Sequence, residues 1–356
     1  MSALSFKEFI SDNFRRPRKD KLPATSKPRI EFIDLAKGVC ILLVVLMHAG
    51  YTNDLPALKA MRMPLYFILS GLFFKDYGSF LNFLYKKINK ILIPFCFFAI
   101  VGIILCRVFY VSASIPGIIL TPFYAPTIAN YPIWFLICLF WVNLLYCVIS
   151  ITITNAFVRG FMVFIVGLVG YFLNVHDVYI PLFIASVCSA LPFFYIGTLL
   201  RKVPIFYDSH KDIRNMAMGV TLIGIVIIYC LFYGTPYIQF RVNHYHGNAI
   251  ASYIVSLSMV FGLFLVCKYI VWLPIVSYLG RYSIIVLCLH AIFLEYGSKF
   301  FSCSALELLL LTLFLCWISI PLCRHFIPFF TAQTDLIKMP KRYSKDQRSV
   351  SLEASK

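Results

Sequence analysis

Charged residues are scarce in this chain, and acidic residues are scarcer still. Only 13% of its 356 residues are charged and 15 are Asp or Glu, whereas 61% are hydrophobic. A soluble domain is about half apolar and about a quarter charged, so this composition excludes an ordinary soluble protein. The first thirty residues contain no apolar run and no small-residue cleavage site, and we therefore expect no signal peptide.

The cysteines lack the spacing of a metal or redox site. The chain has 12 of them, mostly inside apolar runs, with neither Cys-x-x-Cys pairs nor Cys/His ligand spacing. We interpret them as small buried hydrophobic residues and expect no metal. No internal repeat or second domain is visible. We expect one transmembrane domain over 31–330, between a basic cytoplasmic tail over 1–30 and a polar, disordered cytoplasmic tail over 331–356.

Long apolar runs are abundant. Runs of about 20 residues, the length that crosses a bilayer, recur to the end of the chain. They predict an all-α, polytopic integral membrane protein with about ten transmembrane helices. The second run is short and contains Pro64 and Gly71, which predicts a broken or re-entrant helix. The predicted spans lie near residues 32–50, 63–76, 88–110, 132–153, 158–174, 179–200, 214–233, 249–268, 274–295 and 304–323.

Basic residues are concentrated in particular segments. Lys and Arg outnumber Asp and Glu by 32 to 15. Most lie in the two tails and in the predicted loops over 75–90 and 200–214, whereas the intervening loops contain few. This placement indicates orientation in a membrane rather than nucleic-acid binding, and the positive-inside rule predicts that both termini are cytoplasmic.

Asp34, Lys37 and His48 share one face of the first predicted helix. At about 100° per residue, the steps from Lys37 to His48 return to within about 20° of the starting direction, and Asp34 lies about 40° from His48. Ionisable groups inside hydrocarbon are costly, so this stripe indicates a functional path. Alternatively, Asp34 and Lys37 neutralise each other on the helix surface, and His48 is an interfacial residue bonded to a backbone carbonyl.

The histidines are not equally strong candidates for a catalytic role. His48 is the strongest candidate, because imidazole exchanges a proton near neutral pH and suits a general base toward a hydroxyl. His290 ends the ninth predicted span and is either a second site residue or an interfacial group, with Glu295 placed to orient it. His244 and His246 have no evident third metal ligand, and we interpret them as part of a solvated outer loop.

A lysine cluster precedes the apolar run ILIPFCFFAI. It consists of Lys86, Lys87 and Lys90. These residues are either cytoplasmic anchors of the positive-inside kind or a cradle for the phosphates of a nucleotide-bearing donor, in which each lysine acts as a point charge.

Several segments resemble a known family when they are taken in order. A basic residue, ten residues and a histidine occur at Lys37 and His48, and the segment MPLYFILSGLFF follows with Ser70 and Gly71. The further segments are Lys87 and Lys90 before Pro94, YPIWFLICLF around Trp134, FYIGTLL around Gly197, and LGRYSIIVLCLH ending at His290. Over about residues 29–325 the chain resembles the acyltransferase 3 family of bacterial membrane O-acyltransferases, including its fucose 4-O-acetylase-like branch.

The resemblance implies transfer of an acyl group, usually acetyl from acetyl-CoA, to a carbohydrate hydroxyl. The acceptor would belong to a surface polysaccharide, a lipopolysaccharide or a lipid-linked precursor, and the enzyme would lie in the bacterial inner membrane. The donor phosphates would rest near the lysine cluster, and the pantetheine arm would pass Lys37 toward His48. Direct transfer and an acetyl-histidine intermediate both fit this arrangement.

Further residues are candidates for binding roles. Ser70 or a backbone N–H near Gly71 is a candidate for holding the oxyanion. Many relatives have a histidine where this chain has Arg62. The candidates for binding the acceptor are Arg62, Trp134, His290 and Glu295.

Two other classes of function also fit the sequence. A transporter or flippase of a lipid-linked glycan would use ionisable residues within the membrane and a broken helix in the same way. A non-catalytic partner in envelope assembly would leave the stripe of Asp34, Lys37 and His48 without a role. Transfer of labelled acetyl groups to glycan separates the enzyme from both alternatives.

Overall fold

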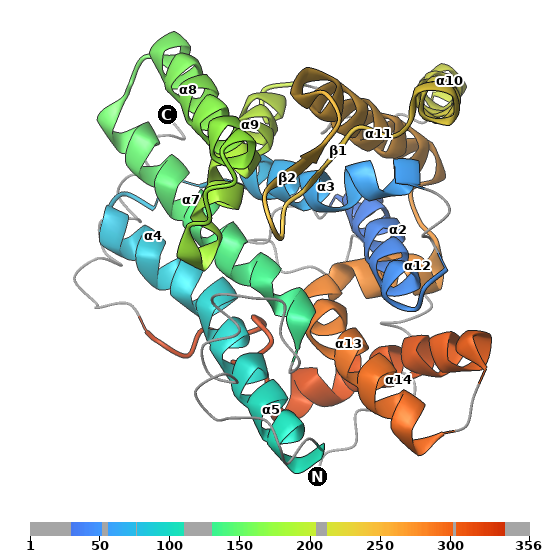
Figure 1. The fold of residues 1–356 in the computed structure, drawn as a ribbon. Coiled ribbons are helices and arrows are strands. Elements are labelled where there is room, and N and C mark those ends of the chain that lie inside the picture. The colour runs from blue at the N-terminus through green and yellow to red at the C-terminus, as the bar shows by residue number, and fades with distance from the viewer. Residues whose placement is uncertain are drawn as a thin grey trace. The chain divides into compact units, whose positions relative to one another are not determined.

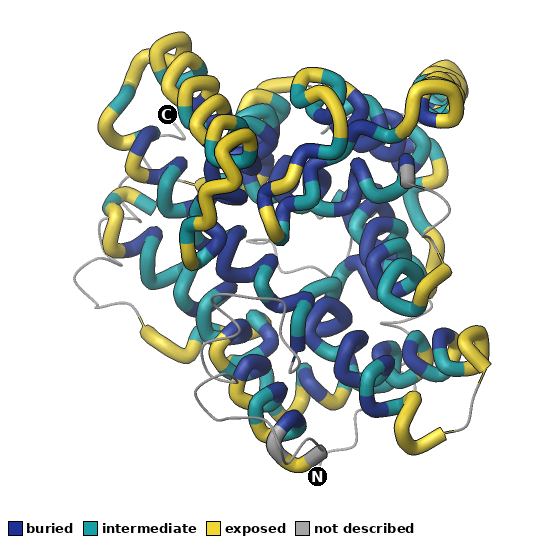
Figure 2. The backbone as a smooth tube through the Cα atoms, viewed as in Figure 1, coloured by how far each residue is buried: buried dark blue, intermediate teal, exposed yellow. Residues whose placement is uncertain are grey.

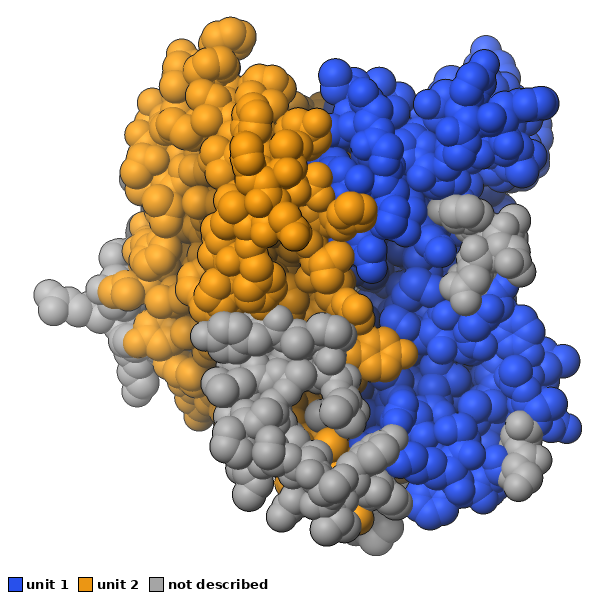
Figure 3. All heavy atoms as spheres, in the orientation of Figure 1, with its two compact units in different colours: residues 1–66, 203–239, 245–321 blue, residues 67–202, 240–244, 322–356 orange. Residues whose placement is uncertain are grey.

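The structure is a computed structural model that describes residues 30–51, 56–75, 77–109, 130–203, 212–301 and 304–338. The predicted basic tail, apart from Ile30, and residues 339–356 of the predicted C-terminal tail lie outside the described residues. The chain divides into two compact units, each assembled from segments that are distant in the sequence (Figure 3).

Unit 1 comprises residues 1–66, 203–239 and 245–321. A two-stranded sheet, formed by β1 (Tyr237–Gln239) and β2 (His244–His246), precedes α11 (Figure 1). Within this unit α10 packs against α11, and α2 packs against α11, α12 and α13. The helices that lie wholly or partly in unit 1 are α2 (Glu31–His48), η2 (Pro56–Leu58), α3 (Lys59–Leu72), α10 (Ile213–Tyr233), α11 (Ala249–Ile270), α12 (Pro274–Arg281), α13 (Ser283–Phe300) and α14 (Ala305–Phe326).

Unit 2 comprises residues 67–202, 240–244 and 322–356. It contains the second part of α3 and the end of α14, and α9 packs against both α7 and α8. A π-helical turn, η3, joins α4 directly to α5. The helices wholly within unit 2 are α4 (Phe80–Lys87), η3 (Ile88–Leu92), α5 (Ile93–Phe109), η4 (Tyr131–Ile133), α7 (Trp134–Thr152), α8 (Ala156–Val175), η5 (Pro181–Phe183) and α9 (Ile184–Leu200).

The predicted all-α, polytopic membrane class is confirmed. Eight helical runs in the described part of the chain are long and apolar enough to cross a membrane. They are Phe80–Cys106, Tyr131–Thr152, Ala156–Val175, Pro181–Leu200, Ile213–Tyr233, Ala249–Ile270, Ser283–Phe300 and Ala305–Phe326. The first two predicted spans correspond to α2, which carries three charged residues in its 18 positions, and to α3, which is only 14 residues long.

The helices α8 and α10 expose apolar side chains around most of their surface. The buried residues of α8 are Val163, Gly167 and Gly170, and those of α10 are Gly219, Val226 and Cys230. Figure 2 shows both helices largely in the colour of exposed residues. The side chains of Phe157 in α8 and Phe232 in α10 are among the most exposed in the described part of the chain. Apolar surface of this extent is expected where a helix faces lipid.

Four local predictions are wrong. The expected loop over 75–90 is helical from Phe80 onward, because the Ser79 side chain accepts a hydrogen bond from the Asn82 backbone N–H and caps α4. Of the two alternatives for the second span, the break is absent, since α3 continues through Pro64; the re-entrant alternative stays a prediction. The ninth predicted span is divided at Tyr282 into α12 and α13. The loop predicted to contain His244 and His246 is a β-strand at these residues.

Residues 331–338, the first part of the segment that was predicted to be disordered, are held by hydrogen bonds. Residues 331–338 are described, and the Asn89 side chain donates to the backbone oxygen of Ile337 at 3.0 Å and accepts from its N–H at 2.8 Å. The polar composition of this segment therefore reflects attachment to η3 through hydrogen bonds rather than disorder. The prediction for the cysteines holds better: of the described cysteines, all but Cys96 are buried.

Candidate functional site

The helix α2 places the predicted catalytic residues in unit 1. It runs without interruption from Glu31 to His48, so the helix on which the shared-face prediction depends is present. Asp34 is buried, whereas Lys37 and His48 are half-buried. The polar stripe of α2 therefore meets other protein elements, as expected for ionisable groups at membrane depth.

The histidines His48 and His290 form a ring contact, which we call the histidine pair. Their ring centroids lie 5.2 Å apart, with the ring planes inclined by 30°. His48 is the last residue of α2, and His290 lies in the middle of α13 and is completely buried. Tertiary packing thus joins two residues that were separate candidates in the sequence.

The backbone of α13 holds the His290 ring in one orientation. Its Nδ1 lies 2.8 Å from the backbone oxygen of Val286, one turn earlier. A carbonyl oxygen can only accept, so Nδ1 donates and Nε2 is left with its lone pair. Nε2 is buried and has no hydrogen-bond partner among the described residues. The prediction that Glu295 orients this imidazole stays a prediction.

Asp34 lies beside a buried cation from α12. The Arg281 Nε is 3.7 Å from the Asp34 carboxylate, and both side chains are nearly buried. The Arg281 guanidinium also lies over the Trp272 ring, 5.6 Å from its centroid. A buried carboxylate with a cation partner is much less costly than an isolated one. This ion pair supports a structural role for Asp34, in addition to the predicted catalytic one.

Two glycines allow α2 and α12 to approach closely at this ion pair. A Cβ at Gly38 would overlap the backbone oxygen of Val276, and a Cβ at Gly280 would overlap the backbone oxygen of Asp34. Small residues at helix interfaces permit backbone contact of this kind within membranes. The two glycines therefore fix α2 against the element that carries Arg281.

Arg62 is buried against α2, in the first part of α3. Its Nη1 donates to the backbone oxygen of Leu43 at 3.4 Å, and its own backbone oxygen accepts from the Cys40 thiol at 3.2 Å. Nearby, the Tyr66 hydroxyl donates to the backbone oxygen of Lys37 at 3.2 Å. These bonds connect α3 to the middle of α2, and they place Arg62, a predicted acceptor-binding residue, in the same unit as His48.

Ser70 and Gly71 lie in unit 2 and have packing partners there. The Asn143 side chain donates to the Ser70 hydroxyl at 3.0 Å and to the backbone oxygen of Leu139 at 2.7 Å. A Cβ at Gly71 would overlap the backbone oxygen of Phe194 in α9. Gly71 therefore serves the close packing of α3 and α9, and this explains its presence without a role in binding an oxyanion.

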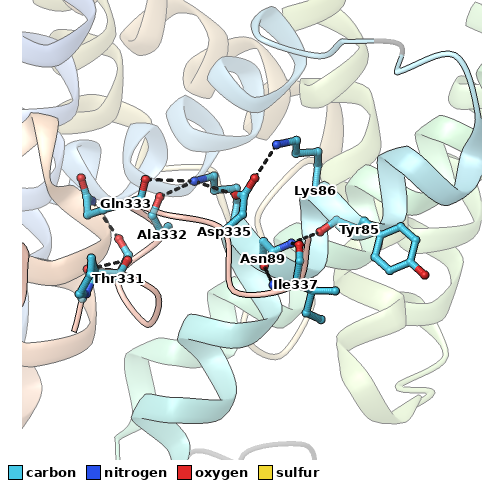
Figure 4. Close-up of polar contacts among 10 residues, drawn as sticks. Tyr85, Lys86, Asn89, Thr331, Ala332, Gln333, Asp335 and Ile337 are labelled. Carbon is cyan, nitrogen blue, oxygen red and sulfur yellow. Dashed lines mark hydrogen bonds and ion pairs between the residues drawn. The ribbon is translucent and has the colours of Figure 1, made fainter. Parts of the chain in front are cut away.

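The lysine cluster contacts the C-terminal segment of unit 2 (Figure 4). The Lys86 Nζ lies 2.5 Å from one carboxylate oxygen of Asp335, and the Lys90 Nζ lies 3.2 Å from the other. Lys90 also donates to the backbone oxygen of Ala332 at 2.8 Å. Lys86 and Lys90, spaced by one helical turn, thus contact an anionic carboxylate and a backbone carbonyl with a partial negative charge.

The electrostatics of this contact are those of a half-exposed ion pair. The Lys86 and Asp335 side chains are each 29% exposed. Partial burial acts to raise the pKa of Asp335, but the hydrogen bonds from Lys86 and Lys90 outweigh it and hold the pKa below its usual value. Lys87 is placed differently, with its Nζ 5.1 Å from the centroid of the Phe83 ring. The cluster therefore binds an anion through two of its three lysines.

The remaining predicted residues have varied surroundings. Trp134 begins α7 and packs on Phe183, with ring centroids 5.5 Å apart. Glu295 is half-buried in α13. The His246 ring stacks on Tyr237 at 4.3 Å, so the hairpin that replaces the predicted loop is held partly by aromatic contact.

Three residues were missed in the sequence. Asn143 could have been noticed as a polar residue inside an apolar run. Arg281 lies in the segment LGRYSIIVLCLH, where the sequence assigns it no role, and Asp335 is one acid in a polar tail. Asp335 is 249 positions from Lys86, so nothing local in the sequence indicates that the two residues meet.

Comparison with known proteins identifies the family. The family profile described as an acyltransferase domain, that of the acyltransferase 3 family, matches residues 30–324. Neither the curated proteins nor the solved structures include a match to the chain. The matched region contains α2, the histidine pair and the lysine cluster, and it covers well over half of the sequence. The protein therefore belongs to the acyltransferase 3 family and is a membrane acyltransferase.

Proposed function

We propose that the protein is an O-acyltransferase that moves an acyl group, in the first instance acetyl, from cytoplasmic acyl-CoA to a carbohydrate hydroxyl. The acceptor is a cell-surface polysaccharide, a lipopolysaccharide or a lipid-linked precursor. The protein lies in the bacterial inner membrane with both termini in the cytoplasm. The observation that carries this proposal is the histidine pair, which puts a half-exposed imidazole against a buried one inside the region matched to the family.

His48 acts as the general base in this proposal. It takes the proton of the acceptor hydroxyl while the oxygen attacks the thioester carbonyl. Collapse of the tetrahedral intermediate breaks the carbon–sulfur bond, and the proton on His48 passes to the departing thiolate of CoA. Imidazole suits both steps, because it gains and loses a proton near neutral pH.

The lysine cluster binds the phosphates of the donor. Support comes from the ion pairs that Lys86 and Lys90 form with the Asp335 carboxylate, because they show that these lysines contact an anionic group. A phosphate offers more charge and more acceptor oxygens than a carboxylate. Acyl-CoA therefore competes with the C-terminal segment for these two lysines, and Lys87 is free of that competition because it lies over Phe83.

The test is transfer of label from [¹⁴C]acetyl-CoA to glycan in isolated membranes that contain the protein. We expect labelled glycan with the wild type and none above background with His48→Ala. The matched control is His325→Ala, since His325 is exposed at the end of α14, and this variant should transfer normally. Mass spectrometry should show surface glycans lighter by about 42 Da per site without the gene, the mass that acyl transfer adds as acetyl.

Undiminished transfer by His48→Ala at normal abundance would remove that residue from the mechanism. Movement of glycan across the membrane without any acetylation would favour the transporter or flippase alternative. A wild-type protein that labels no glycan contradicts the proposed activity.

A further inference from the structure

We propose that His290 is the positioning residue of His48: its Nε2 accepts a hydrogen bond from one N–H of His48, and this bond strengthens while His48 carries the acceptor's proton. The inference rests on the proposed function of His48 as a general base. It assigns to His290 a role that differs from binding of the acceptor carbohydrate, because a completely buried ring inside α13 offers no surface to a sugar.

The first support is the unpaired lone pair of His290. Its Nδ1 is engaged by the Val286 carbonyl, and its Nε2 is buried with no hydrogen-bond partner among the residues that the structure describes. Buried polar atoms are almost always paired, and leaving one unpaired is destabilising. Nε2 is therefore able to accept a hydrogen bond from a group that approaches it during function.

The second support is the nearness of His48. The ring centroids of the two imidazoles lie 5.2 Å apart, and at this separation an N–H···N hydrogen bond forms once the half-exposed ring turns an N–H toward Nε2. His290 is held by its backbone hydrogen bond, so His48 is the ring that moves. The two helices that carry the histidine pair, α2 and α13, pack directly against each other.

The chemistry follows from the number of protons on His48. Neutral imidazole has one N–H, whereas the imidazolium formed when His48 takes the hydroxyl proton has two. The nitrogen of His48 that takes this proton is the one with the lone pair, so the single N–H of neutral His48 is on the other nitrogen and donates to Nε2 of His290. This hydrogen bond is stronger while His48 is an imidazolium, because its donor is then charged, and it weakens when His48 passes the proton to the thiolate of CoA.

An interaction that is stronger in the protonated state accelerates the reaction, because it stabilises the transition state more than the ground state. A carboxylate could serve the same purpose, as in hydrolase triads. A neutral acceptor has the advantage that it places no permanent negative charge among the apolar residues of α13, such as Ile285 and Val286.

The experiment compares His290→Phe, which keeps a ring but has no lone pair, with His290→Gln, whose amide oxygen can accept. We expect His290→Phe to lower kcat about tenfold to a hundredfold, as for loss of a hydrogen bond to a charged group, with KM unchanged for acetyl-CoA. His290→Gln should recover most of kcat. Ile285→Ala, a loss of buried volume on the same helix, is the control for packing and should leave kcat near the wild-type value.

Abundance and thermal unfolding in detergent are measured for all three variants. Wild-type kcat in His290→Phe would overturn the inference. So would a His290→Gln variant that is as slow as His290→Phe while it is as stable as Ile285→Ala, since this result would show that only the shape of the ring matters. Both outcomes leave the proposed acyl transfer intact, whereas absence of transfer by the wild type contradicts the proposed function itself.

Discussion

The histidine pair of unit 1 and the lysine cluster of unit 2 are built in different ways. His290 is completely buried and His48 ends a helix that two glycines hold at backbone contact with α12. In the lysine cluster, by contrast, the side chains of Lys86 and Lys90 are 29% and 38% exposed and meet a carboxylate from the end of the chain.

The difference is consistent with the two tasks proposed for these sites, proton transfer at the histidine pair and donor binding at the lysine cluster. Proton transfer requires groups that are held in one geometry, and close packing supplies this. Binding and release of a charged donor require contacts that exchange readily with water and ions, and half-exposed ion pairs do so because each contributes little free energy. We therefore expect changes at the histidine pair to alter kcat and changes at the lysine cluster to alter KM.

The largest effect is expected for His48→Ala. Loss of the general base should lower kcat by a factor of about 10² to 10⁴, with little change in KM for acetyl-CoA. Steady-state transfer rates at varied donor concentration measure this. An equal rise in KM would show that His48 also contributes to donor binding, and the contrast between the two regions would be weaker than proposed.

The second-largest effect is expected for Gly280→Ala, which should lower the free energy of unfolding. The added Cβ overlaps the backbone oxygen of Asp34, so α12 must move away from α2. Overpacking of this kind costs about 1–3 kcal/mol of unfolding free energy. Thermal unfolding in detergent measures it, and Gly224→Ala is the control because no atom lies within 4 Å of a Cβ there. Equal stability of the two variants would contradict the close packing of α2 and α12.

An intermediate effect is expected when Lys86 and Lys90 are both replaced by alanine. KM for acetyl-CoA should rise about tenfold, as for loss of two charged contacts, with kcat nearly unchanged. In the wild type KM should also rise with salt, because exposed charges are screened. If KM stays the same in the variant, the lysine cluster acts only as a topological anchor.

The smallest effect is expected for Asp335→Asn. Removing the competing carboxylate should lower KM for acetyl-CoA by about threefold or less, in keeping with the modest strength of a half-exposed ion pair. A raised KM would mean instead that Asp335 holds the lysines in place for the donor. Lys338→Ala is a control in the same segment.

The pH dependence of this contact has a definite direction. The pKa of Asp335 is lowered in the folded protein, so its ion pairs are complete at neutral pH. They are lost only as the pH falls below about 4, through the lowered pKa. Protease cleavage of the C-terminal segment should therefore increase in Asp335→Asn at pH 7, and in the wild type only under strongly acidic conditions.

Much of the architecture was predictable because hydropathy is a local property. An apolar run of sufficient length must form a helix in lipid, since its backbone groups have no other partners. The helix over 249–268 was predicted within two residues of α11. Where local signals compete, prediction failed. The Ser79 cap begins α4 before the apolar run, and the break at Tyr282 lies inside one.

Hydropathy and helical periodicity act over a few turns, and they were enough to predict a helical membrane protein in which Asp34, Lys37 and His48 belong to one helix. The acyltransferase 3 family was predicted from the resemblance of several segments in order. The neighbours of the three residues come from tertiary packing. His290 meets His48, Arg281 meets Asp34, and Asp335 meets Lys86. Contacts between residues so distant in the chain depend on the packing of whole helices, and no local pattern encodes that packing.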